Sequence, residues 1–330
     1  MNFKIRKNII ILIIALVVCI CFITGCSDTK EDWDNTKNIN KVEIKSSTEW
    51  DSDDEMISVS KRNIEVFKLL EQNFGGFICD TNNYDIIDGK ERYKWVNWDD
   101  EENQEQVFSI KFDYEGHCIS VSKNYFDYNK VLTINNNDIR EQLKEDTNTV
   151  NILVPEKYKN REQDIINIYR DYMMFNNVEV ANIYTDRLGL SKDTRLSDDF
   201  NVNIIYVKND QKYFSFKPEI AVKSNNYIED CIVIVLSPET IHPVQMYGVM
   251  TRGLFSPMST KNIDSEEDQI KQLFLNLDSE DSFFKLKSVY STYREHKQDK
   301  ILAISIIILV AIIFTVFVLL LIRKVKKVSK

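Results

Sequence analysis

The sequence has little glycine and histidine, and this limits the active sites it can hold. Only eight of its 330 residues are glycine and three are histidine. Neither GxGxxG nor GxxxxGK[ST] occurs, so no glycine-rich loop that cradles nucleotide phosphates is indicated, and the chain is not an ATPase by itself. The GxSxG elbow of serine hydrolases is missing as well.

The histidines His117, His242 and His296 lie in three different predicted environments. A Ser-His-Asp or Cys-His arrangement assembled from distant segments stays open, but no local motif supports one. His242, between Ile241 and Pro243, fits a turn. The sequence therefore predicts no catalytic residue, and we expect a protein that is not an enzyme.

Cysteine is scarce between the hydrophobic ends of the chain. Cys79, Cys118 and Cys231 form no CxxC pair and have no histidine at zinc spacing, so neither a zinc site nor a redox motif is predicted. Each lies beside apolar residues, which favours three buried thiols. One disulfide at most is the alternative.

Positive charge is scarce in the middle of the chain. The formal net charge is -9, and the basic residues gather near both ends. No basic patch is available to displace counterions from phosphates, which argues against nucleic acid. The acidic residues 198–199 and 99–102 lack the EF-hand spacing with its central glycine, so we expect solvated loops, with no metal and no cofactor.

An apolar run near the N-terminus, from Ile9 to Ile23, follows basic residues at 4–7 and precedes Gly25 and Cys26. This pattern fits a secretory signal. Residues 23–26 followed by a serine also resemble a lipobox, in which Cys26 is lipidated after cleavage. The alternative is an uncleaved anchor, since the run is near the lower edge of the about 17–25 residues of a spanning helix. Under either interpretation the chain beyond residue 26 is exported.

A second apolar run, from Ile301 to Ile322, has no charged residue and is long enough to span a hydrocarbon core of about 30 Å. Five basic residues follow within 323–330. Such a cluster beside a span predicts the cytoplasmic side, so residues 27–300 are expected outside the membrane. A buried core helix would rarely be apolar all round over this length.

The region between the two runs predicts an α+β domain. We expect a helix from an N-cap at Ser60 to Gly75-Gly76, then a hairpin of strands 107–112 and 117–122, and a further strand over 131–134. Several aromatic residues here can line a ligand groove, but core and strand packing accounts for them better. They are Trp95, Trp98, Tyr125, Phe126 and Tyr128.

A strand over 150–154, a helix over 161–175 and a strand-like segment over 178–184 come next along the chain. Residues 202–207 and 213–216 flank an Asn-Asp turn and predict a second hairpin. The continuous apolar run from Cys231 to Leu236 is typical of a strand buried on both faces. This order favours helices packed on one face of a mixed or antiparallel sheet.

Beyond residue 238 an apolar segment broken by glycines predicts a loop or short helix over the sheet edge. From Ser282 a helical pattern runs without Gly or Pro into the second apolar run. The predicted organisation begins with a signal, lipoprotein signal or N-terminal anchor over 1–26 and an acidic flexible tether over 27–59. An extracytoplasmic α+β domain follows over 60–262, with possible subdomains 60–149 and 150–262. The chain then continues as a helical stalk over 263–300, a transmembrane helix over 301–322 and a basic cytoplasmic tail over 323–330.

Four stretches carry a resemblance to a known family: 130–137 (KVLTINNN), 151–158 (NILVPEKY), 203–214 (NIIYVKNDQKYF) and 229–238 (EDCIVIVLSP). The chain resembles, over roughly 56–322, bacteriocin-associated integral membrane proteins that occur with small ABC transporters in low-GC Gram-positive bacteria. Family members usually have several more spans, so this chain resembles a short version with two hydrophobic segments. The resemblance carries over no catalytic residue.

The resemblance implies an accessory or immunity protein of a bacteriocin or peptide export system. Its expected partners are the membrane, ABC transporter subunits and a peptide bacteriocin, with no nucleic acid. A surface lipoprotein that binds a small ligand or peptide is the alternative, and it would be favoured by lipidation of Cys26.

Overall fold

The computed structural model describes residues 30–44, 52–87, 90–91, 112–189, 191–258, 268–270, 272 and 284–328. Residues 1–35 form one compact unit and residues 36–330 another. In the first unit the structure describes the short helix α2 (Lys30–Asp34). The predictions for the segment 1–26, for the tail beyond residue 328 and for Trp95 and Trp98 lie outside the described residues.

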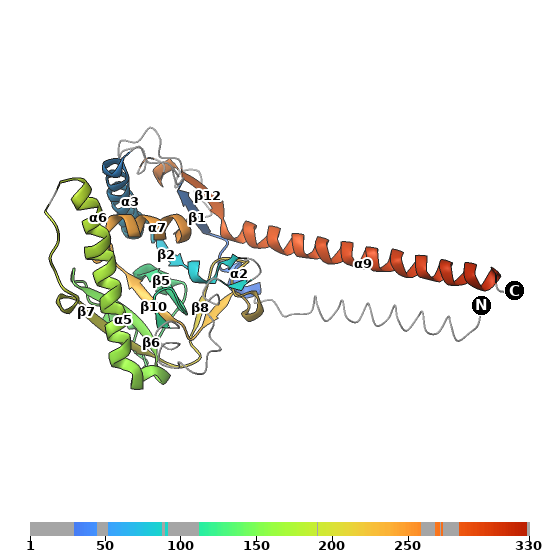
Figure 1. Ribbon diagram of the computed structural model, residues 1–330, viewed down its shortest axis with the longest axis horizontal. Coiled ribbons are helices and arrows are strands. Elements are labelled where there is room, and N and C mark those ends of the chain that lie inside the picture. The colour runs from blue at the N-terminus through green and yellow to red at the C-terminus, as the bar shows by residue number, and fades with distance from the viewer. Residues whose placement is uncertain are drawn as a thin grey trace. The chain divides into compact units, whose positions relative to one another are not determined.

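An eight-stranded mixed sheet is the framework of the second unit (Figure 1). Strands β5 and β10 are parallel, as are β6 and β7, and the other neighbours are antiparallel. The α+β class with a mixed sheet is therefore confirmed. In spatial order the strands are β12 (Phe284–Ser288), β1 (Ile39–Ile44), β11 (Leu254–Pro257), β2 (Phe77–Asp80), β5 (Cys118–Ser122), β10 (Ile232–Leu236), β6 (Thr149–Pro155) and β7 (Asn201–Val207).

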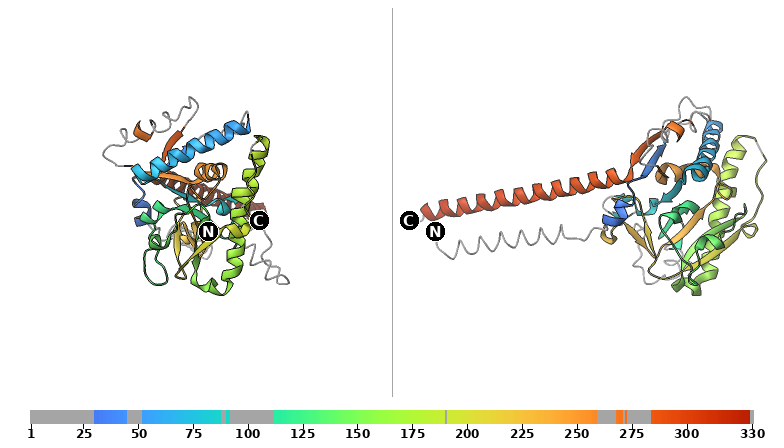
Figure 2. Two further views of the ribbon diagram at one scale, coloured as in Figure 1. Left: turned by 90° about the vertical axis from the view of Figure 1, so that its left-hand side faces the viewer. Right: turned by 180° about the vertical axis from the view of Figure 1, so that it is seen from behind.

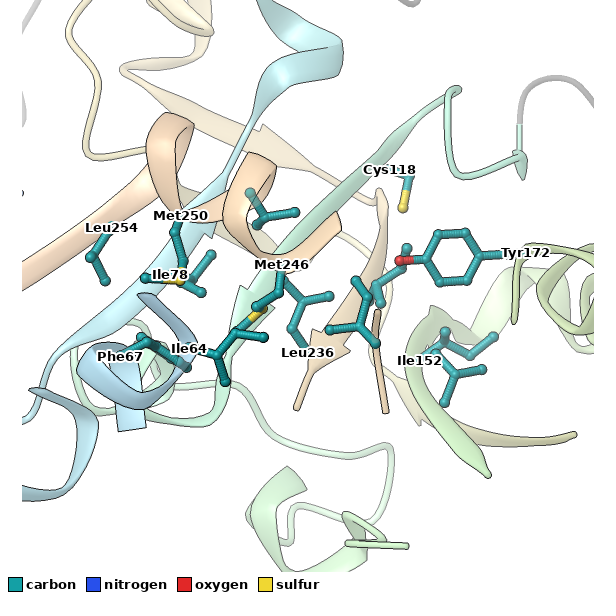
Figure 3. Close-up of a cluster of buried hydrophobic side chains, with 14 of the residues drawn as sticks. Ile64, Phe67, Ile78, Cys118, Ile152, Tyr172, Leu236, Met246, Met250 and Leu254 are labelled. Atoms are coloured by element: carbon teal, nitrogen blue, oxygen red, sulfur yellow. The ribbon is translucent and has the colours of Figure 1, made fainter. Parts of the chain in front are cut away.

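Three helices cover one face of this sheet, namely α3 (Asp53–Phe74), α5 (Glu162–Met174) and α7 (Pro243–Gly253) (Figure 2). Their apolar sides join every second strand residue in one hydrophobic core, as the period of two in a strand requires. Figure 3 shows Phe67 of α3, Met250 of α7 and Tyr172 of α5 around Ile78 and Ile152 of the sheet. Burying each large apolar side chain contributes about 1.5–3 kcal/mol.

Aromatic side chains and a small second sheet cover the opposite face. Phe77, whose neighbour Ile78 faces the helices, stacks on Phe255 with ring centroids 5.3 Å apart and tilts against Phe216 at 5.0 Å. Tyr125 and Phe126 are buried in this layer, which confirms core packing for them, whereas Tyr128 is 38% exposed, so core packing is wrong for it. The small sheet pairs β8 (Lys212–Phe214) with β9 (Tyr227–Glu229).

The α3 helix begins earlier than predicted. Its N-cap is Ser52, whose hydroxyl accepts from the Glu55 amide at 3.2 Å, while Ser60 is buried within the helix. The acidic residues expected in a tether occupy its first turn, where the helix dipole favours negative charge. The predicted flexible tether over 27–59 is therefore wrong for residues 39–44, which form β1, and for residues 53–59, which begin α3. Gly75, at φ 66°, ends the helix as predicted.

Neither predicted hairpin forms in the described part of the chain. Both edges of β5 are taken by β2 and β10, so β5 is not one half of a hairpin; residues 107–111 of its predicted partner lie outside the described residues. The Asn-Asp turn at 209–210 exists, with Asp210 at φ 61°, but β7 pairs with β6 and β8 pairs with β9. The turn was predicted correctly, whereas the predicted strand partners were wrong.

Two further boundaries differ from the prediction. Residues 178–184 are helical, because α5 continues through a π-helical turn (Phe175–Glu179) into α6 (Val180–Arg187). The predicted division at residue 150 is wrong, since β2 and β5 from the first half lie between β11 and β10 from the second. The apolar segment after residue 238 is a helix on the sheet face, followed by the interior strand β11.

The chain leaves the domain through β12 and α9 (Val289–Val328). Residues 284–288 are a strand, so the predicted all-helical stalk is wrong there, but α9 runs unbroken through 301–322 as expected. Of the described helices, α9 alone is long and apolar enough to cross a membrane, and none of its most apolar stretch is buried. This exposure distinguishes it from the core helix of a soluble protein.

Candidate functional site

A polar cleft of about 230 Å³ lies over β5 on the helix-covered face of the sheet. The helices α3 and α7 contact the β1 side of the sheet, and α5 contacts the β7 side. Between them, β5 presents the small side chains of Cys118 and Ser120, which leave room above the strand. Other lining residues are Asp80, Asn83, Tyr114, Glu115, Gln245 and Arg252.

An ion pair joins two elements at this cleft. Arg252 in the last turn of α7 donates from Nη2 to Asp80 Oδ2 at 2.6 Å, and from Nε to Oδ2 at 3.0 Å and Oδ1 at 3.2 Å. The side chain of Asp80 is 6% exposed and that of Arg252 is 40% exposed. The backbone N–H of Asn82 also donates to Asp80 Oδ1, at 3.1 Å. The buried carboxylate is therefore well satisfied by hydrogen bonds.

Gly253 makes this pairing possible, because α7 approaches β2 at backbone distance. A Cβ at position 253 would lie 2.3 Å from the carbonyl oxygen of Cys79 and 2.9 Å from the nitrogen of Asp80. Only glycine fits there. The neighbouring Arg252 is thereby brought within hydrogen-bond distance of Asp80.

Aromatic rings form another wall of the cleft. The ring of Tyr114 lies 5.0 Å from that of Tyr172 and 6.5 Å from that of Phe175, which is stacked on it at 20°. Asn83 holds the segment before β5 by donating from Nδ2 to the carbonyls of residues 114, 116 and 118. Phe175 begins the π-helical turn, and such turns are frequent at functional sites.

The Cys118 thiol at the edge of the cleft is not an activated nucleophile. Burial raises its pKa to about 12, so the reactive thiolate is scarce at neutral pH. The Tyr169 hydroxyl donates to Cys118 Sγ at 3.4 Å. Cys79, Cys118 and Cys231 are all buried free thiols, which confirms that prediction. Burial likewise raises the pKa of Tyr114 to about 12, so its hydroxyl stays protonated.

None of the three histidines lines the cleft. Both ring nitrogens of His117 are engaged, with the Tyr84 hydroxyl at 2.8 Å and the Glu229 carbonyl at 2.9 Å. His242 is the N-cap of α7, where its Nδ1 accepts from the Val244 amide at 3.3 Å. His296 lies in α9.

No group of three or more His, Cys, Asp or Glu residues in the described ranges is placed to hold a metal ion. At the predicted acidic loop, Asp199 accepts from the Leu196 amide at 2.7 Å and Asp198 is 3.8 Å from Arg170. Residues 99–102 and the lipidation candidate Cys26 lie outside the described residues.

No family model matches the chain, and neither a curated protein nor a solved structure resembles it. The likeness to bacteriocin-associated membrane proteins therefore rests on the four sequence stretches alone. Sequence reasoning missed the cleft because Asp80 and Arg252 lie far apart in the chain. The alternation of small side chains at 118, 120 and 122, which keeps bulk off one face of β5, is the signal that could have indicated it.

Proposed function

We propose that this protein is a membrane-anchored extracytoplasmic accessory component of a bacteriocin or peptide export or immunity system, working with an ABC transporter. The apolar helix α9 supports the anchor, and the basic residues that follow its span support a cytoplasmic tail. The N-terminal apolar run, as a signal or second anchor, agrees with the same orientation.

The observation that carries this proposal is the direct junction of the sheet with α9. Strand β12 ends at Ser288 and α9 begins at Val289, with no loop between them. Strand β12 is in turn paired along β1, from Asn40 opposite Ser288 to Ile44 opposite Phe284. Because a partner that moves the sheet also moves the edge strand, the domain is built to transmit its state to the membrane helix.

Orientation is testable with a membrane-impermeant maleimide on intact cells. Asp198→Cys, at a side chain that is 92% exposed, should be labelled from outside, and Lys327→Cys only after permeabilisation. The unsubstituted chain is the matched control, since its domain thiols are buried. Labelling of Lys327→Cys in intact cells would refute the orientation.

The transporter role is tested by co-purification of the full chain with an ABC transporter from its native membrane. Deletion of the gene should change sensitivity to a peptide bacteriocin. An unchanged sensitivity together with no transporter in the purified sample would refute this role, whatever the orientation.

A surface lipoprotein that binds a small ligand is the second candidate, and the cleft over β5 favours it. Labelling with a lipid precursor should mark the native chain and leave Cys26→Ser unmarked if this candidate is right. Absence of label on the native chain would leave the N-terminal run as an uncleaved anchor.

A further inference from the structure

The size of the cleft over β5 restricts what can occupy it. Pockets for drug-sized ligands have volumes of roughly 300–1,000 Å³. At about 230 Å³ this cleft is smaller, so it fits a molecule of about amino-acid size.

Arg252 supplies a site for an anionic group. Its Nε and Nη2 are the atoms that bind Asp80, so Nη1 is left on a guanidinium whose side chain is 40% exposed. Asp80 is covered by comparison, at 6% exposed. A guanidinium held in place by a buried carboxylate is preorganised to bind the carboxylate of a ligand.

A different wall of the cleft favours a cation. Glu115, an exposed acidic residue, lines the cleft together with the aromatic residues Tyr114, Tyr172 and Phe175. Ammonium groups are attracted both by carboxylates and by the faces of aromatic rings. Arg252 comes from α7, whereas Glu115 and the aromatic residues come from the segment before β5 and from the end of α5, so the two charge preferences arise from different elements around the cleft.

We propose that the cleft binds a small zwitterion, as a free amino acid or a dipeptide. A purely anionic ligand such as phosphate would be repelled by Glu115 and would approach a guanidinium whose charge Asp80 already offsets. A purely cationic ligand would be repelled by the Arg252 guanidinium. A molecule that carries both charges satisfies both walls, and this inference extends the ligand-binding candidate above.

The test uses the full chain in detergent and measures its melting temperature and heat of binding with each free amino acid and a set of dipeptides. At least one is expected to bind and raise the melting temperature. The methyl ester of that ligand lacks the carboxylate and its N-acetyl form lacks the ammonium. Each blocked form should bind at least about tenfold more weakly, or about 1.4 kcal/mol. Tighter binding of the dipeptide than of its amino acids identifies a peptide source, and the reverse identifies free amino acids.

Two variants link binding to the cleft. Glu115→Gln, at an exposed side chain, should weaken binding without altering the fold, and Arg252→Lys should weaken it by loss of the planar fork. Glu145→Gln, 74% exposed and outside the cleft, is the control that should bind as the native chain does. No binding by any amino acid or dipeptide, equal binding of the blocked forms, or native affinity in Glu115→Gln would overturn the proposal. Labelling from outside and transporter co-purification are independent of these results, so the failure of either proposal is recognisable.

Discussion

Replacing Arg252 with methionine tests whether the ion pair at the cleft stabilises the fold. Methionine keeps an apolar stem over the same surface, so the loss is confined to the charge and its hydrogen bonds. In Arg252→Met the buried Asp80 carboxylate loses three donor contacts and keeps the Asn82 amide. The substitution isolates the cost of an unpaired buried charge.

Breaking a fully buried pair costs about 3–5 kcal/mol, whereas exposed pairs contribute about 0–1 kcal/mol. With Asp80 covered and Arg252 at 40% exposed, we expect a loss of about 2–4 kcal/mol. At about 2–4 °C per kcal/mol for a domain of this size, the melting temperature should fall by about 4–16 °C.

The assay is thermal unfolding of the full chain in detergent, followed by near-ultraviolet circular dichroism. The double variant Asp80→Leu/Arg252→Met removes both charges, and most of the stability should return because no buried charge is left. If Arg252→Met melts together with the native chain, the carboxylate is solvated and the pair does not stabilise the fold. A double variant as unstable as the single one would also contradict the reasoning.

Three further outcomes are expected. Gly253→Ala should destabilise the protein by at least about 1–3 kcal/mol in urea unfolding, because its Cβ would lie 2.3 Å from a backbone oxygen. The control Gly248→Ala should cost less, because its Cβ would meet only the tip of the Arg252 side chain, at 3.3 Å. Burial raises the pKa of Glu71 to about 7, so the folded state favours the neutral carboxyl and the protein loses stability as pH rises from about 4.5 through 7. Glu71→Gln should abolish this loss, which is about 1–3 kcal/mol at pH 8. An unchanged pH profile of the melting temperature in the variant would contradict this. The thiols Cys79, Cys118 and Cys231 should resist alkylation at neutral pH until the domain unfolds, as counted by mass spectrometry.

The sequence correctly predicted those helices and strands that are stabilised mainly by contiguous residues or are completely buried. The apolar run of β10 is buried at every position, and Pro155 ends β6. The α5 pattern and the unbroken α9 were also visible, since helical period and hydrophobic length are properties of contiguous residues. The α+β class follows from the order of such elements.

Elements that depend on distant partners were missed. Strand β1 mixes charged with apolar residues because it lies near the sheet edge, and only its pairing with β11 and β12 makes it a strand. The β-branched segment 178–184 looked like a strand, yet it continues the helix through a π turn. Tertiary packing overrides propensity in both cases.

The cleft depends on contacts that no local pattern carries. Asp80 and Arg252 are joined only by the close approach of α7 to β2 at Gly253, and a glycine at a helix end is more commonly a C-cap than a point of close backbone contact. The sequence shows which charged and polar side chains the chain contains, but only the folded structure shows which of them lie next to one another.

The antiparallel register of β1 and β12 sets how the domain responds to mechanical load. Asn40 at the start of β1 lies opposite Ser288 at the end of β12, so both strands are pulled from the same end when the flanking chain is drawn apart. Force applied in this direction breaks the pairs one after another, starting from Asn40 and Ser288, and does not shear all of them at once. Under such a pull β12 is the first of the eight strands to separate, and the seven strands beyond it keep their hydrogen bonds.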